Sequence, residues 1–248
     1  METTCVFKRI EKKYLLSEEK YDALFRRIGE HLRPDAFGRS TVLSLYLDTP
    51  DHRIIRNSIE ATDYKEKLRL RSYGTAGAES EVFLELKKKF KGVVYKRRAV
   101  MTLAEAENYL AQGIKPRESQ IMSEIDWAMK LYGRPKPAML IACEREAWFD
   151  GEHPDLRLTF DRGIRYRERE LQLRSGSAGT LLLPENTVLL EIKTGGAMPL
   201  WLAHALDAET ILPGSFSKYG EAYTRSLEGS KRPAHISAEG GSQHVVNL

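Results

Sequence analysis

Cationic side chains recur at every second position of the segment 65–73. The odd positions carry Lys65, Lys67, Arg69, Arg71 and Tyr73, and the even positions include Leu68 and Leu70. Residues two apart on a β-strand point to the same face, so this spacing predicts a strand with one apolar and one almost purely cationic face. Like charges that face one another on paired strands are destabilising. The clustered cationic face therefore indicates that an anionic ligand sits among these side chains.

The chemistry of this cluster suits phosphate. Arg69 and Arg71 offer forked donors that can bind phosphate oxygens in a bidentate manner. Carboxylates share strand faces with lysines in Glu85-Leu86-Lys87 and in Glu191-Ile192-Lys193. This mixture of signs favours a metal–phosphate site, because a nucleic-acid surface would be basic with exposed stacking aromatics.

The elements that must position these residues follow from the same alternation. Strands are predicted over 6–16, 41–48, 65–73, 81–89, 93–101, 138–149, 156–173 and 186–195. Capping residues and helical spacing predict helices over 17–31, 50–59, 102–112, 118–132, 199–208 and 217–227. Without a βαβ rhythm, this order predicts an α+β fold of about eight strands. If the sheet closes on itself, it is a closed eight-stranded antiparallel β-barrel with a charged lumen, surrounded by helices. An open sheet with a solvated basic face is the alternative.

Composition fits a globular chain with a hydrophobic content of 42% and a formal net charge of +4, too small a charge by itself to imply nucleic acid. A single domain is expected over residues 1–228, followed by a disordered tail over 229–248. Cys5 and Cys143 form no CxxC pair, so buried free thiols are expected and no metal site on sulfur. With no signal peptide and no transmembrane segment predicted, we expect a cytoplasmic protein.

Six short motifs, in order and spacing, resemble the VTC domain of polyphosphate polymerases. They are Arg9-Ile10-Glu11-Lys12-Lys13-Tyr14, Leu68-Arg69-Leu70-Arg71-Ser72-Tyr73, Glu85-Leu86-Lys87, Arg157-Leu158-Thr159-Phe160-Asp161, Glu191-Ile192-Lys193 and Phe216-Ser217-Lys218-Tyr219. The resemblance spans roughly Cys5 to Leu227. It implies a triphosphate tunnel, a barrel that holds triphosphate or polyphosphate together with Mn²⁺ or Mg²⁺. Arg9 departs from the superfamily pattern, which has a glutamate there, and this moves the expected site away from a two-metal hydrolase.

The resemblance also implies roles for individual residues. Those expected to bind phosphate are Lys13, Arg69, Arg71, Lys87, Lys96, Arg157, Arg167, Lys193, Ser217 and Lys218. Arg69, Arg71, Lys87 and Lys218 are the catalytic candidates among them. Arg165 and Arg169 compete with Arg167 for the place of one family arginine. Glu191 is the expected metal ligand, with Glu85 and Glu11 as further candidates.

The predicted function is phosphoryl transfer from ATP or another nucleoside triphosphate to a growing polyphosphate chain, with no specific nucleic acid as partner. Positioning and electrostatic stabilisation account for most of the catalysis in such transfers. Two alternatives stay open. One is hydrolysis of tripolyphosphate or of a nucleoside triphosphate, with Glu11 or Glu85 positioning the water. The other is a non-catalytic module that binds polyphosphate or RNA.

Overall fold

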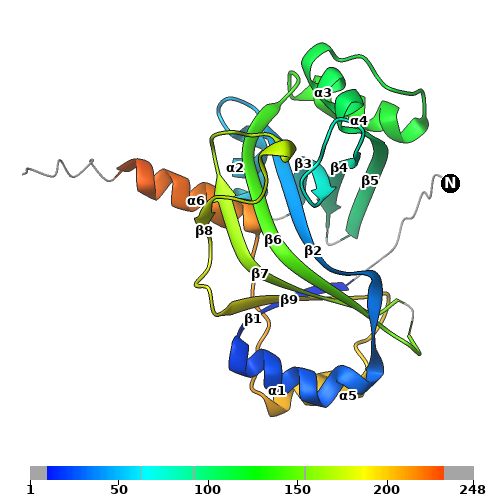
Figure 1. Cartoon of the computed structure of the whole chain (residues 1–248), viewed down its shortest axis with the longest axis vertical. Coiled ribbons are helices and arrows are strands. Elements are labelled where there is room, and N and C mark those ends of the chain that lie inside the picture. Colours follow the sequence, from blue (N-terminus) through cyan, green and yellow to red (C-terminus); the bar gives the residue numbers. More distant parts are fainter. Residues whose placement is uncertain (1–9, 62, 92, 154, 232–248) are drawn as a thin grey trace, which may run out of the picture.

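A twisted antiparallel sheet forms the centre of the computed structural model, which describes residues 10–61, 63–91, 93–153 and 155–231 (Figure 1). The strand order is β1-β9-β7-β6-β2-β3-β4-β5, and the short β8 pairs with β7. The strands are β1 (Ile10–Ser17), β2 (Leu32–Asp48), β3 (Tyr64–Tyr73), β4 (Glu81–Phe90), β5 (Val93–Thr102), β6 (Lys136–Asp150), β7 (Arg157–Arg167), β8 (Thr180–Leu181) and β9 (Thr187–Thr194). Together with the helices, this antiparallel sheet gives the predicted α+β class.

Helices pack against the outside of this sheet. They are α1 (Glu18–Ile28), α2 (Arg53–Glu60), α3 (Leu103–Gln112), α4 (Gln120–Leu131), α5 (Leu200–Ala208) and α6 (Lys218–Lys231), with 3-10 turns η1 (Gly29–His31) and η2 (Leu173–Ser175). Helices α1 and α5 lie side by side at one end of the molecule, and α3 and α4 lie at the other end beside β4 and β5 (Figure 1). No helix in the described ranges is long and apolar enough to cross a membrane.

Side-chain caps fix where several helices begin. Ser17 accepts a hydrogen bond from the backbone N–H of Lys20 at the start of α1, and Ser119 caps α4. Thr102 and Glu105 form a reciprocal capping box at the start of α3. Each such cap satisfies backbone donors that a helix leaves unpaired. The caps at Ser17 and Thr102 agree with the helix starts predicted at residues 17 and 102.

The hydrophobic core lies between the sheet and the helices. Leu68 and Leu84 on the sheet share one buried cluster with Met122 of α4, and the other faces of these strands carry the charges. A second cluster joins β1, β7 and β9 to α1 and α5, and a third joins β2 and β6 to α2 and α6. Full burial of a leucine contributes about 1.5–3 kcal/mol, so the apolar faces turn outward to the helices. The charged faces are left to point inward.

The sheet differs from the predicted closed barrel. No ladder joins β1 to β5 among the described residues, and the strand order ends at these two strands. Side chains connect the two ends of the sheet instead. Nζ of Lys87 on β4 lies 3.0 Å from Oε2 of Glu11 on β1. Lys96 and Arg98 stand along the free edge strand β5, and charges on an edge strand oppose further strand pairing. The sheet is consequently a charged tunnel wall without full backbone closure.

Several element boundaries also differ from the predictions. Strand β2 begins at Leu32 rather than 41, and β7 ends at Arg167 rather than 173, shortly before Glu170 adopts a positive φ of 50°. Helix α6 continues to Lys231, so Gly229–Lys231 belong to a helix and not to the predicted tail. The rest of that tail, 232–248, lies outside the described residues, as does Cys5.

Candidate active site

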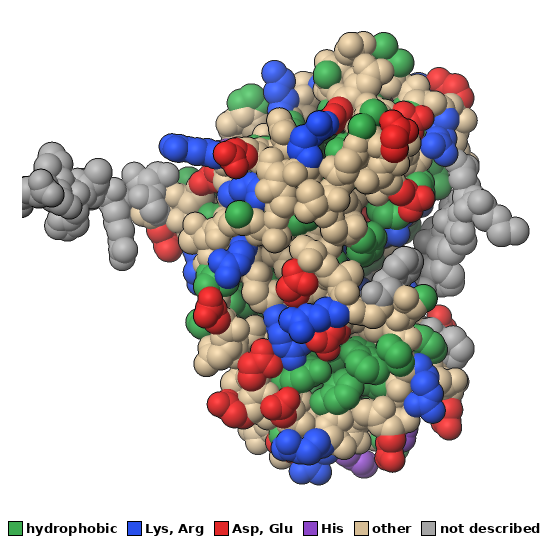
Figure 2. Space-filling model, viewed as in Figure 1, with side chains coloured by type: hydrophobic (Ala, Val, Ile, Leu, Met, Phe, Trp, Pro, Cys, Tyr) green, Lys and Arg blue, Asp and Glu red, His purple; other side chains and the backbone are tan. Residues whose placement is uncertain are grey.

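A cavity of about 1090 Å³ lies between the inward faces of the strands. Its lining includes fourteen Lys or Arg side chains but four Asp or Glu side chains. The outer surface differs, because Figure 2 shows acidic and basic side chains interspersed over the visible face. An excess of cations around an enclosed space creates a strong positive potential there. The cavity is therefore suited to a polyanionic ligand.

Glu85 organises the cations of the β3–β4–β5 wall. Its side chain is 1% exposed and does not line the cavity, because Arg69 and Lys96 contact its two oxygens at 2.7 and 2.6 Å and Arg98 contacts it at 2.6 Å. The strand register explains this arrangement, since Glu85 lies directly between Arg69 and Arg98. Burial alone would raise the pKa of Glu85, but the surrounding cations hold it well below its usual range. Glu85 thus stays ionised and orients its neighbours.

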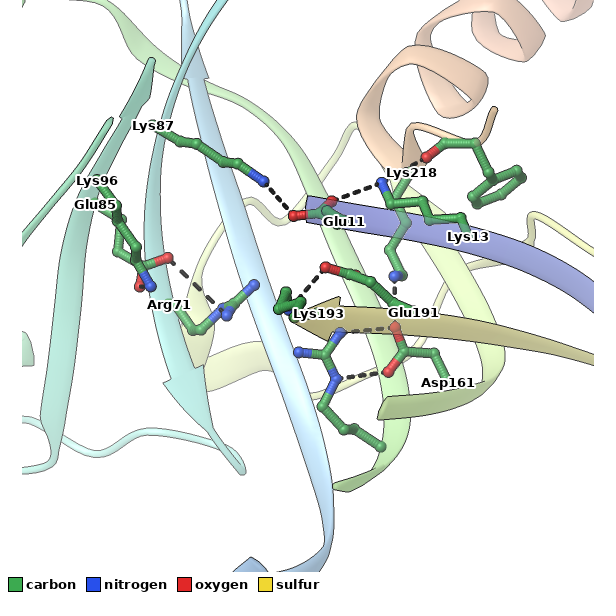
Figure 3. Close-up of polar contacts among 12 residues, drawn as sticks. Glu11, Lys13, Arg71, Glu85, Lys87, Lys96, Asp161, Glu191, Lys193 and Lys218 are labelled. Carbon is green, nitrogen blue, oxygen red and sulfur yellow. Dashed lines mark hydrogen bonds and ion pairs between the residues drawn. The ribbon is translucent and has the colours of Figure 1, made fainter. Parts of the chain in front are cut away.

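The two arginines of β3 are held by partners on both neighbouring strands. Arg71 is 7% exposed, donates to Ser44 Oγ at 3.3 Å, and extends toward Glu191 and Lys193 in Figure 3. Arg69 donates to the hydroxyl of Tyr46 at 3.3 Å. Burial would raise the pKa of Tyr46, yet Arg69, Lys67 and Arg71 lower it to about 8. This network fixes both guanidinium groups before any ligand arrives.

Two lysines and two glutamates alternate along and across the paired strands β1 and β9. Lys13 lies opposite Glu191, and Glu11 lies opposite Lys193. Lys193 Nζ is 2.7 Å from Glu191 Oε1, and Lys13 Nζ is 3.4 Å from Glu11 Oε1. Burial would raise the pKa of Glu191, but Lys193 and Lys13 hold it well below its usual range. Figure 3 shows Lys87 reaching across from β4 to Glu11, so the two walls meet at this point.

A buried ion cluster between β6, β7 and α6 was missed by sequence reasoning. Arg145 donates to both oxygens of Asp161 at 2.6 and 2.7 Å, and Lys218 contacts the same carboxylate. Asp161 is fully buried, and the two cations lower its pKa although burial opposes this. Asp161 closes one of the six sequence motifs, but the position of Arg145 opposite it emerges only from the pairing of β6 with β7.

The start of α6 is anchored at the cavity by lysines from two distant strands. Lys67 Nζ donates to Ser217 Oγ at 2.7 Å, and Lys13 Nζ donates to the carbonyl of Phe216 at 2.8 Å. Burial, Lys13 and Lys87 lower the pKa of Lys67 to about 8. Lys67 was not among the predicted site residues, although the alternation in 65–73 places it on the cationic face.

Some of the remaining predicted site residues line the cavity, and others lie outside it. Lys96 and Arg157 line the cavity, and Arg157 is 3.7 Å from Asp35 near an exposed edge of it. Arg167 does not line the cavity. Its guanidinium donates instead to the backbone carbonyls of Gln172, Gly176 and Ala178 in the β7–β8 connection. The structure therefore places Arg167 outside the cavity, where its side chain organises a loop. Arg165 and Arg169 also lie outside the cavity lining.

Two carboxylates fit a divalent ion. The described residues hold no cluster of three or more Asp, Glu, His or Cys side chains at metal distance. Mg²⁺ is nevertheless commonly held by one or two carboxylates plus substrate phosphates. Glu11 and Glu191 are the two candidates, since they lie close enough for the charge of Glu191 to oppose ionisation of Glu11. Glu85 does not fit, since it lies outside the cavity lining and three cations contact its oxygens at 2.7 Å or less. Arg9, which stands where the superfamily pattern has a glutamate, lies outside the described residues.

Cys143 lines the cavity as a buried free thiol, as predicted. Burial and Asp161 raise its pKa to about 11. A thiol with such a pKa is protonated near neutral pH and is a poor nucleophile. Cys143 therefore does not supply covalent catalysis.

Comparisons with known proteins found a matching family and similar solved structures. The family described as "VTC domain" matches residues 8–227. A candidate adenylate cyclase from Bacillus halodurans has a similar structure, with a TM-score of 0.51 and 15% identity over 84% of this chain and 93% of that one. A candidate adenylyl cyclase from Hippeastrum, described as having a dominant triphosphatase activity, gives a TM-score of 0.48 and 17% identity over 88% and 96% of the two chains. No match was found among curated proteins.

The fold is thus an antiparallel sheet whose inward face lines a cation-rich cavity suited to polyanions. The chain belongs to the VTC domain family, whose match covers most of its length. Membership of this family supports an enzymatic activity on triphosphate or related phosphoryl compounds.

Proposed function

We propose that the protein is a phosphoryl transferase that makes polyphosphate from a nucleoside triphosphate. The observation that carries this proposal is the state of the carboxylates that line the cavity. Each of the four, Glu11, Asp35, Glu66 and Glu191, lies within 3.7 Å of a Lys or Arg nitrogen. An ion-paired carboxylate is a weak base for activating water. A phosphate acceptor is already an anion and needs no base.

The transfer requires alignment and charge neutralisation more than proton transfer. In the proposed step, a terminal oxygen of the polyphosphate chain forms a bond to the γ-phosphorus, and the bond from that phosphorus to the β-bridging oxygen breaks. The nucleoside diphosphate leaves with the electron pair. Arg69 and Arg71 on one wall and Lys13, Lys193 and Lys218 on the other would hold the phosphates in line and stabilise the charge of the transition state.

Glu191 and Glu11 are the residues that would hold Mn²⁺ or Mg²⁺. Such an ion supplies charge neutralisation at phosphate oxygens when it is bound. Without it, the chain's own residues still define the phosphate path. Lys67 and Ser217 fix the start of α6 beside that path, and Glu85 keeps the β3–β5 cations in place.

The test is incubation of the purified protein with ATP and Mn²⁺ or Mg²⁺, followed by parallel measurement of ADP, free phosphate and polyphosphate on a gel. Polymerisation predicts ADP without an equal amount of free phosphate, together with chains that an exopolyphosphatase degrades. Equal amounts of ADP and free phosphate without chains would establish hydrolysis and overturn the proposal. Neither product, with tight binding of tripolyphosphate, would identify a binding module.

Two variants make this test specific. Arg71→Ala removes an arginine from the cavity wall and should abolish chain formation. Arg165→Ala removes an arginine on β7 that does not line the cavity, so it changes net charge by the same amount and should leave the reaction unchanged. Equal losses in both variants would show that overall charge, and not the cavity, governs activity.

A further inference from the structure

An aromatic and aliphatic surface stands at one end of the cation-lined cavity, where β3 finishes. Tyr73 and Val100 line the cavity there, and 42% and 36% of their surfaces are exposed. In the strand register, Arg71 lies opposite Phe83, and Phe83 lies opposite Val100. Tyr73 follows two residues after Arg71 on the same face, about 7 Å along the strand. We call Tyr73, Phe83 and Val100 the apolar rim.

The ring of Tyr73 is held in place before any ligand binds. Phe83 packs against it edge to face, with ring centroids 5.7 Å apart and planes at 77°. The guanidinium of Arg98 lies 4.5 Å from the centroid of Phe83. Arg71 and Arg98 also act on the hydroxyl of Tyr73, because they lower its pKa although burial opposes this. A flat, partly exposed aromatic ring is thus fixed directly beside the arginines of the phosphate path.

The other end of the same three strands has a different character. Its inward positions carry five lysines and one valine, paired across the strands: Lys65, Lys67, Lys87, Lys89, Lys96 and Val94. The aromatic apolar rim and this lysine-rich surface therefore lie at opposite ends of the three strands. A nucleoside triphosphate has the same separation, with a flat base at one end and a chain of negative charges at the other. Inorganic polyphosphate has negative charges along its whole length.

From this match we infer that the apolar rim is the nucleobase subsite of the donor, with the base stacked on Tyr73 and the triphosphate directed past Arg71 and Arg98 into the cavity. The inference rests on the proposed function, because it assumes that a nucleoside triphosphate is the substrate. Stacking on an aromatic ring accepts every base, since each base has a π-face. The rim therefore distinguishes nucleoside triphosphates from inorganic triphosphate and gives little preference among bases.

The experiment compares binding of ATP and of inorganic tripolyphosphate by calorimetry to the whole protein and three variants. Tyr73→Ala should weaken ATP binding about ten- to a hundredfold, as expected for the loss of one base–aromatic stack, and should leave tripolyphosphate binding within about twofold. Tyr73→Phe keeps the ring and removes the hydroxyl, so it should bind ATP much as the original protein does. Trp127→Ala is the control, since Trp127 is 59% exposed on α4 and does not line the cavity.

The outcomes separate the nucleobase subsite from the proposed polymerisation. Equal weakening of ATP and tripolyphosphate by Tyr73→Ala would mean that Tyr73 merely orients the arginines, and would overturn the nucleobase subsite. The subsite is also overturned if Tyr73→Phe loses as much ATP binding as Tyr73→Ala, or if Tyr73→Ala changes the binding of neither ligand. Selective loss of ATP binding by Tyr73→Ala, in a protein that makes no polyphosphate, would instead keep the subsite and remove the proposed polymerisation.

Discussion

Replacement of Glu85 by glutamine tests whether this carboxylate organises the tunnel wall or holds a metal. The amide keeps the size of the side chain and removes its charge. Arg69, Lys96 and Arg98 would then be left close together around a neutral group, since all three contact the Glu85 carboxylate at 2.7 Å or less. Removing one partner from a buried ion network typically costs about 3–5 kcal/mol. We expect Glu85→Gln to lower the free energy of unfolding by an amount in this range.

The assay is urea unfolding alongside a thermal melt, each with and without tripolyphosphate. For a chain of this size, a loss of about 1 kcal/mol lowers the Tm by roughly 2–4 °C, so the Tm should fall by roughly 6–20 °C. Tripolyphosphate can neutralise the cations that the carboxylate no longer pairs. It should therefore raise the Tm of the variant by more than it raises that of the original protein.

The control is Glu81→Gln on the same strand, where the side chain is exposed and the expected change is within about 0.5 kcal/mol. The reasoning is refuted if Glu85→Gln unfolds like the Glu81→Gln control. It is also refuted if the variant is stable but has lost its response to Mn²⁺, because that result would make Glu85 a metal ligand.

Three further predictions concern the phosphate path. Arg71→Ala should lower turnover at least about a hundredfold, as expected when a transition-state contact worth ~3 kcal/mol is lost; near-normal turnover with every triphosphate tested would place Arg71 outside the reaction. Glu191→Gln should remove the Mn²⁺ dependence of activity while tripolyphosphate binding survives, and an unchanged metal response with a lowered Tm would make Glu191 purely structural. Burial lowers the pKa of Lys96 to about 7 and that of Lys67 to about 8, so both lose charge as the pH rises through these values. Tripolyphosphate affinity should consequently fall between pH 6 and pH 9, with proton uptake on binding, and Lys96→Arg should flatten the profile; an unchanged profile in that variant would contradict the assignment to Lys96.

The sequence predicted much of the wall chemistry, because strand alternation is a local property. In β3, the alternation of side chains from Lys65 to Tyr73 predicted that Arg69 and Arg71 share the inner face, and both line the cavity in the structure. The same rule on β7 could not decide between Arg165, Arg167 and Arg169, since the strand ends at Arg167 and the chain then turns. Where the strand stops, alternation no longer says where a side chain points.

Partners across strands were beyond the reach of sequence alone. Arg145 and Asp161 lie on different strands and meet through the register of β6 with β7, which no local pattern encodes. The role of Glu85 likewise depends on strands to either side that bring Arg69 and Arg98 to it.

Closure was also decided at the tertiary level. The sequence determined which faces are charged and which are apolar, because that follows from a period of two along each strand. Whether the first and last strands pair depends on the accumulated twist of the whole sheet and on the charges of its edges. In this protein the Lys87–Glu11 ion pair joins the walls where the described residues form no β1–β5 ladder. The chain thus encodes the lining of the tunnel locally, and its closure is a property of the assembled sheet.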